Sequence, residues 1–170
     1  MTFIADNVEL IRQGLSLLDD VDGELYAKRE PAISSSAIGS HLRHVVDYYQ
    51  RFLVGLEVGR IDYDQRERDE RVELDRSTGI ARLRRLVNEL EGLRGRDTEP
   101  SLRIKVDAAD ESSWATSSVE RELQFLRSHT VHHFALIAVI LRLNGYEPGE
   151  EFGVAPSTLR YWKENGVCAR

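Results

Sequence analysis

The sequence predicts an all-α protein, a four-helix bundle in which residues 1–170 form a single domain. Four long segments carry apolar residues at steps of three and four, the spacing that places them along one face of an α-helix. A chain of 170 residues has the length of one ordinary domain, and such a chain can bury a core without disulfides. Amphipathic helices become stable when their apolar stripes pack together, and a bundle provides that packing.

The first two helices are predicted over residues 3–19 and 36–55. The first ends at Asp20, and residues 23–35 are expected to form a connection whose serines, Ser34–Ser36, offer N-caps for the second helix. The apolar stripes are Ile4, Val8, Ile11, Leu15 and Leu18 in the first helix, and Ile38, Leu42, Val45, Tyr49, Phe52 and Leu56 in the second.

Residues 60–76 differ from the helices in composition, because they contain five arginines and seven acidic residues. Mixed charge of this density predicts a solvated segment, either a surface helix or a long crossover loop. The connection between the second and third helices is about 20 residues long, which is long for a hairpin between adjacent helices and permits a crossover.

The third helix is predicted over residues 76–94, with Ser77 or Thr78 as its N-cap. Its apolar stripe is Ile80, Leu83, Val87, Leu90 and Leu93. Residues 101–116 alternate between apolar and polar side chains over a short distance, which predicts a strand or a small hairpin.

The fourth helix is predicted over residues 118–143. Ser117 and Glu120 have the spacing of a capping box at its start, and Asn144-Gly145 is a stop signal at its end. The helix is apolar on two sides after Phe125, so it is expected to be the most buried of the four. Residues 146–170 are expected to form an irregular tail packed on the bundle, with a short helical turn at 157–163.

Composition argues against several classes of protein. The formal net charge is −6, whereas nucleic-acid binding needs a concentrated basic face, so no nucleic-acid partner is expected. No run of about 18 uncharged apolar residues exists, so no membrane span is expected. The sequence MTFIADNVELIRQ at the N-terminus is neither a secretory signal nor a transit peptide, so a cytoplasmic location is expected.

All five histidines fall in two places, at positions 41 and 44 and at positions 129, 132 and 133. His129 and His133 are four residues apart, so a helix projects them from one face, close enough to bind one ion. A third imidazole must come from His41 or His44. Three protein ligands with open positions left for water are typical of a catalytic metal site. The alternative is that the histidines pack in the core without a metal.

Two familiar helical metal motifs do not match. Zinc proteases carry His-Glu-x-x-His, but Thr130 stands at the position of the glutamate. Carboxylate-rich di-iron bundles need Glu-x-x-His on two helices, and Glu122 does not have that spacing from His129.

The sequences IGSHLRHVVD at 38–47 and HTVHH at 129–133 resemble the DinB/YfiT-like superfamily of four-helix bundle proteins. The resemblance implies a metal ligand at His44, followed by Val-Val-Asp, and a ligand pair at His129 and His133. It leaves His41 and His132 as neighbours of the site. It also implies a crossover between the second and third helices, and homodimers are common in that family.

The resemblance implies several functions, because some family members are thiol-dependent transferases or isomerases and others are proposed metal-dependent hydrolases. We expect a divalent ion, zinc or nickel first, with iron or manganese also compatible. We also expect a small-molecule substrate, with a low-molecular-weight thiol as one candidate. Tyr48, one turn after His44, is the candidate for a catalytic hydrogen-bond donor, and Tyr63, Arg66 and Cys168 are more remote candidates. The alternative function is a non-catalytic, stress-related bundle that binds a metal or a small ligand.

Overall fold

A computed structural model of the chain describes residues 2–95 and 101–166; Cys168 lies outside the described residues. These two ranges contain seven α-helices, one short 3-10 helix and three short strands. The prediction of a helical protein is therefore confirmed, with the addition of a small sheet.

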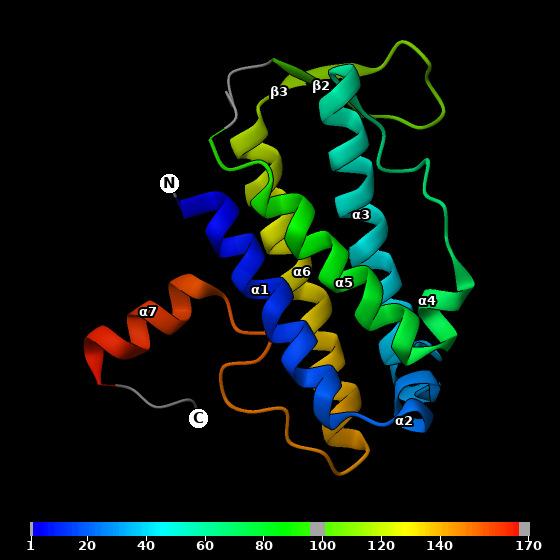
Figure 1. Ribbon diagram of the computed structural model, residues 1–170, viewed down its shortest axis with the longest axis vertical. Helices are drawn as coiled ribbons and strands as arrows, with labels where there is room; N and C mark the ends of the chain where they lie inside the picture. The colour runs from blue at the N-terminus through cyan, green and yellow to red at the C-terminus, as the bar shows by residue number, and fades with distance from the viewer. Residues whose placement is uncertain (1, 96–100, 167–170) are drawn as a thin grey trace.

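Four long helices surround one hydrophobic core (Figure 1). They are α1 (Thr2–Asp20), α3 (Ile38–Val58), α5 (Arg76–Glu91) and α6 (Val119–Leu143). Helices α1 and α3 each pack against both α5 and α6. Figure 1 shows α3 and α5 running in the same direction, so the segment that joins them returns along the length of the molecule.

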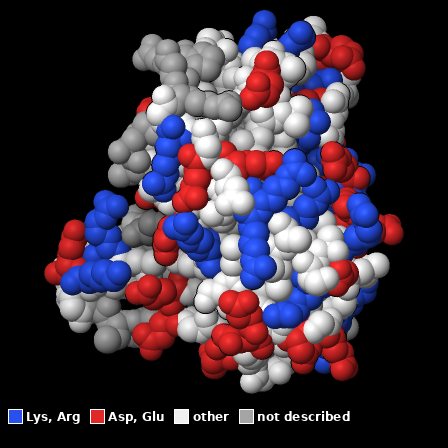
Figure 2. Space-filling view, viewed as in Figure 1, with Lys and Arg blue, Asp and Glu red and all other residues white. Residues whose placement is uncertain are grey.

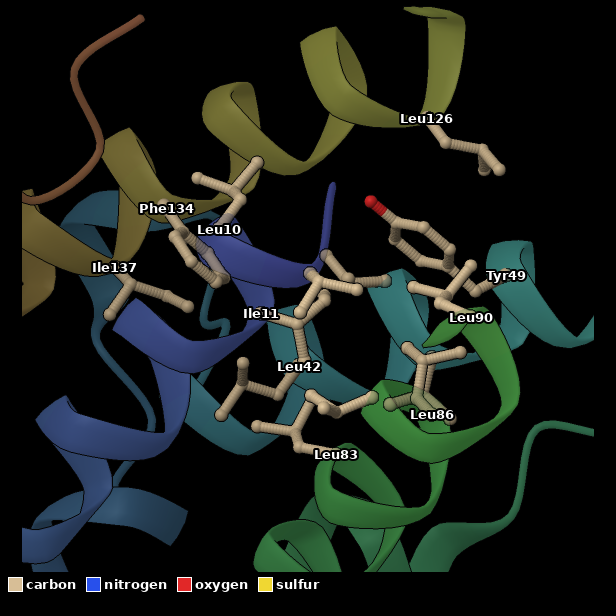
Figure 3. Packing of buried hydrophobic residues seen from close by; sticks show 14 of the residues in the cluster. Leu10, Ile11, Leu42, Tyr49, Leu83, Leu86, Leu90, Leu126, Phe134 and Ile137 are labelled. Carbon is tan, nitrogen blue, oxygen red and sulfur yellow. The ribbon is translucent and has the colours of Figure 1, made fainter. Parts of the chain in front are cut away.

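The core is built from the apolar faces that the spacing predicts (Figure 3). All four long helices contribute fully buried side chains, among them Ile11, Tyr49, Leu83 and Phe134. Three residues of the predicted stripes, Leu15, Leu56 and Ile80, are only partly buried. The outward faces carry the charge: basic and acidic side chains are interleaved over α5 and its neighbours (Figure 2).

A three-stranded sheet lies at the end of α3 (Figure 1). Strand β2 (Leu102–Lys105) pairs antiparallel with β3 (Trp114–Ser117), which confirms the predicted hairpin. Strand β1 (Arg60–Ile61) pairs parallel with β2 and was not predicted, because it has only two residues. It directly follows the left-handed Gly59 that ends α3, so it fixes where the charged segment begins.

The far end of the charged segment is also fixed. Helix α4 (Glu70–Leu74) packs against α3 and buries Val72. Gly39 permits this contact, because a methyl group there would collide with the backbone carbonyl of Glu73. The hydroxyl of Tyr26 donates to the carbonyl of Val72 at 2.5 Å. The segment expected to be a solvated surface is thus anchored at both ends.

The connection expected over residues 23–35 contains structure of its own. Helix α2 (Gly23–Ala27) begins at Asp22, whose side chain accepts from the amide of Leu25, and a 3-10 helix follows at Pro31–Ile33. None of the serines at 34–36 caps α3. Its N-cap is Ala37, and the hydroxyl of Ser40 accepts from the Ala37 amide at 3.3 Å.

Two other predicted caps were also wrong. Asp75 caps α5 and accepts from the amides of Ser77 and Thr78, because a carboxylate two or three residues upstream offers two acceptors. Ser118 caps α6 by accepting from the amide of Arg121, so the box between Ser117 and Glu120 does not form.

The tail is more regular than expected. Phe152 stacks on Phe134 with ring centroids 4.9 Å apart, which holds the start of the tail against α6. The predicted short turn is the ten-residue helix α7 (Pro156–Asn165). Within the described ranges, no helix combines the length and apolar composition needed to cross a membrane.

Candidate metal centre

Three imidazoles converge where α3 packs against α6. The Nε2 atom of His129 lies 3.2 Å from Nε2 of His44 and 3.3 Å from Nε2 of His133. Each residue offers one nitrogen, and the three nitrogens lie within 4.8 Å of one another. Helix α6 supplies two of them because His129 and His133 are one turn apart on the same face. The structure thus brings together the three predicted ligands.

The geometry of these nitrogens fits a divalent ion. Zinc–nitrogen bonds are about 2.0–2.1 Å long, so two nitrogens on one tetrahedral ion are about 3.3 Å apart. The predicted alternative, in which the histidines only pack, does not require three nitrogens to point at one place. The donor set is three neutral nitrogens from half-buried side chains, which leaves further coordination positions open.

The electrostatics of the cluster keep its imidazoles neutral, as metal ligands must be. Burial, then the neighbouring charged groups, lower the pKa of His44 to about 4 and that of His129 to about 4. The same causes lower the pKa of His133 to about 3. Each ring therefore keeps one unprotonated nitrogen at neutral pH.

His41 and His132 adjoin the cluster, as predicted. Nδ1 of His41 lies 3.0 Å from Nδ1 of His133, and the His41 side chain is buried. This contact orients the His133 ring when its Nδ1–H donates to His41, which turns the Nε2 lone pair towards the cluster. His132 is exposed and meets His133 only through a ring-edge contact of 5.2 Å.

An aromatic wall of three residues, Tyr48, Tyr63 and Phe125, flanks His129. The Tyr48 ring stacks on His129 at 4.1 Å, and Tyr63 stacks on Tyr48 at 5.1 Å. The Phe125 ring lies 5.7 Å from His129. Tyr48 contacts the site through its ring, and its predicted role as a hydrogen-bond donor stays a prediction.

The contribution of Phe125 and Glu122 to the aromatic wall was not predicted from the sequence. Phe125 precedes His129 by one turn, so helical spacing alone could have placed it on the same face. Glu122 is buried and accepts hydrogen bonds from Tyr63 at 2.8 Å and from Ser117 at 2.5 Å. Its role is to hold Tyr63 in the wall, and no local signal in the sequence indicates that long-range contact.

Comparison with known proteins shows the family of this chain. The model of the DinB family matches residues 5–155. The chain belongs to the DinB family. A curated relative is FK506-binding protein 5 of Rhizopus delemar, which is 28% identical over 173 residues. The match covers 96% of this chain and spans 40% of the length of that relative. No solved structure matches significantly.

In this DinB chain the remote candidate Arg66 also reaches the site. Its Nη1 lies 3.0 Å from Nδ1 of His44, and its guanidinium lies 5.4 Å from the centre of the Tyr48 ring. Tyr63 and Arg66 both come from the charged segment between β1 and α4. Two of the three remote candidates therefore lie at the cluster, and Cys168 is outside the described residues.

Thr130 faces away from the histidine cluster of the DinB chain. It is fully buried, and its hydroxyl donates to the carbonyl of Leu126 at 2.8 Å and contacts the Tyr49 hydroxyl at 3.3 Å. Tyr49 in turn donates to Oδ1 of Asn7 at 2.5 Å. Thr130 therefore belongs to a polar network inside the core, and this network explains why a hydroxyl-bearing residue occupies the position.

Proposed function

We propose that this DinB-family protein binds one divalent metal ion through His44, His129 and His133 and uses it as a metal-dependent enzyme. The observation that supports this proposal is the convergence of three neutral Nε2 atoms at 3.2 and 3.3 Å. Three half-buried rings that face one another lose part of their contact with water, and a shared ion satisfies one nitrogen of each ring.

We further propose zinc or nickel as the ion, because imidazole suits both, with iron, which imidazole also suits, and manganese as alternatives. The fold that we propose for this site is a four-helix bundle with a crossover between α3 and α5. The parallel course of these two helices in Figure 1 supports it. A homodimer is proposed from the family alone.

The proposed reaction is a thiol-dependent transfer or a hydrolysis of a small molecule. A divalent ion in such a site supplies a Lewis acid and lowers the pKa of a water or thiol that binds to it. His41 orients the His133 ring. The aromatic wall shields the His129 side of the cluster from water, and the Tyr48 ring covers the His129 imidazole.

Elemental analysis of the purified protein tests the metal assignment. About one divalent ion per chain is expected in the wild type, as for a single three-histidine site. His44→Ala and His129→Ala should lose it. His132→Ala is the matched control and should keep the ion, because His132 is an exposed neighbour on the same helix. Undiminished metal in both ligand variants would overturn the assignment.

Activity assays then separate an enzyme from a binding protein. Metal-loaded wild type, chelated wild type and His129→Ala should be compared in panels of thiol-transfer and hydrolysis reactions. Turnover that depends on both the ion and His129 is expected. A fully loaded protein that is inactive in every reaction of both panels favours the non-catalytic bundle.

A further inference from the structure

Arg66 brings an unpaired positive charge to the histidine cluster. Within the described residues its guanidinium makes one hydrogen bond, from Nη1 to His44, and no carboxylate forms an ion pair with it. Its Nε is buried without a partner. The neighbouring Arg43 differs, because it is paired with Asp47 at 3.1 Å and Glu73 at 3.0 Å. An arginine with this much unused donor capacity needs an acceptor.

The loop that carries Arg66 is held in place. It begins at Ile61, which is fully buried in β1, and it ends before Val72, which is buried in α4. Nε of Arg51 on α3 donates to the carbonyl of Asp62 at 3.0 Å, which ties the start of the loop to the helix that carries His44. The position of the guanidinium beside the cluster therefore follows from the packing of the loop.

The contact between Arg66 and His44 conflicts with metal binding by His44. A guanidinium only donates, so Nδ1 of His44 accepts, and the single N–H of the neutral ring is then on Nε2. To bind a metal through Nε2, His44 must instead carry its proton on Nδ1. That Nδ1–H would then face the N–H groups of Arg66, and two donors cannot form a hydrogen bond. The two arrangements exclude each other. When His44 holds an ion, the Arg66 guanidinium is released to another acceptor at the same site.

We propose that Arg66 binds a carboxylate group of the small-molecule substrate at the metal-loaded cluster, so that the site prefers organic carboxylates to uncharged analogues of the same shape. This inference rests on the proposed function. Three neutral imidazoles, a divalent ion and a guanidinium leave the site positively charged, because Asp47, which lies within electrostatic range of Arg66, forms its ion pair with Arg43. A planar carboxylate matches the guanidinium fork. With Arg43 already paired, Arg66 is the arginine at the cluster that is free to receive this carboxylate.

Binding of small probes to the cobalt-loaded protein tests this inference, with calorimetry and the visible absorption of cobalt as readouts. The probes are benzoate, benzamide, which has the same shape without the charge, and inorganic phosphate. The wild type should bind benzoate roughly tenfold or more tightly than benzamide, the usual effect of a charged hydrogen bond. Phosphate should bind more weakly than benzoate.

Variants of two arginines in one loop identify the group responsible. Arg66→Gln should reduce benzoate affinity roughly tenfold, and Arg66→Lys should restore part of it because a point charge lacks the fork. Arg68→Gln removes the same charge from an exposed position two residues away and should bind benzoate as the wild type does.

The experiment distinguishes a failure of the proposed role of Arg66 from a failure of the proposed metal binding. Cobalt content is measured first, and a wild type that binds no cobalt overturns the proposed function. A loaded wild type that binds benzoate no more tightly than benzamide, or an Arg66→Gln variant with undiminished benzoate affinity, overturns the role of Arg66. Phosphate binding that is tighter than benzoate binding and depends on Arg66 overturns the choice of a carboxylate.

Discussion

The Nε2 atoms of His44 and His129 lie 3.2 Å apart, although 85 positions separate the two residues in the sequence. One belongs to α3 and the other to α6, so the pair exists only when these helices have packed together. A metal ion held by both residues therefore binds the folded chain and not the unfolded one. Metal binding and folding are coupled in such a site.

Removal of the metal should lower the melting temperature of the wild type. An ion at 100 times its dissociation constant stabilises the folded state by about 2.7 kcal/mol. Thermal unfolding with added zinc and with a chelator measures the difference. His44→Ala should melt at the same temperature in both conditions, while His132→Ala should respond as the wild type does. A wild-type melting temperature that the chelator leaves unchanged contradicts the coupling.

His41→Phe should weaken metal binding while keeping an aromatic ring at this position. The substitution removes the Nδ1 atom that lies 3.0 Å from Nδ1 of His133, so the ligand loses its orienting partner. Loss of such a partner typically costs a factor of about 10–100 in affinity. Competition with a chromophoric chelator gives the dissociation constant, and His132→Ala provides the comparison. Wild-type affinity in His41→Phe would show that His41 only fills space.

The metal-free protein should lose stability as the pH falls from 7 towards 5. Burial lowers the pKa of His44 to about 4 and that of His133 to about 3, below the value of about 6.5 in an unfolded chain. The unfolded state therefore binds more protons throughout this window, and the free energy of unfolding decreases with decreasing pH. Urea denaturation in the presence of a chelator measures the slope. His133→Gln should show a shallower slope, and equal slopes for both proteins contradict the prediction.

Periodicity was sufficient for the four long helices and for two of the three converging imidazoles. Residues at i and i+4 share a helix face whatever the rest of the chain does, so His129 and His133 could be paired from the sequence. The third, His44, depended on resemblance to a family. Spacing alone left His41 as an equal candidate, because both lie at the edge of the same apolar face.

The position of the charged segment could not be predicted, because it depends on contacts between distant residues. Arg66 reaches His44 since β1 pairs with β2, more than 40 positions further along, and α4 docks where Gly39 leaves room. The composition of this segment predicted only a solvated surface. The cap of α5 was missed for a local reason. Asp75 accepts from the amides of Ser77 and Thr78, and the hydroxyls of both residues donate to the same carboxylate, so neither hydroxyl serves as the N-cap.

Tyr49→Phe should destabilise the fold without changing the metal content. Its hydroxyl donates to Asn7 at 2.5 Å, and both side chains are fully buried; Figure 3 shows Tyr49 among the core residues. Leaving a buried acceptor unpaired costs about 1–3 kcal/mol. Urea denaturation measures this loss, and elemental analysis checks the metal. Tyr161→Phe removes an exposed hydroxyl and should be neutral. A loss of metal in Tyr49→Phe would mean that the core network and the histidine cluster are not separate.

Gly39→Ala should displace α4 and with it the loop that carries Arg66. The added methyl group would meet the carbonyl oxygen of Glu73 and the Tyr26 ring, and backbone on both sides of that contact cannot yield without separating α3 from α4. Overpacking of this kind typically costs about 1–3 kcal/mol. Denaturation measures that cost, and benzoate affinity of the cobalt-loaded variant reports the displacement of Arg66. Gly23→Ala is the control, because nothing lies within 4 Å of a methyl group there. Equal stability of the two variants would show that α4 is not held by its contact with Gly39.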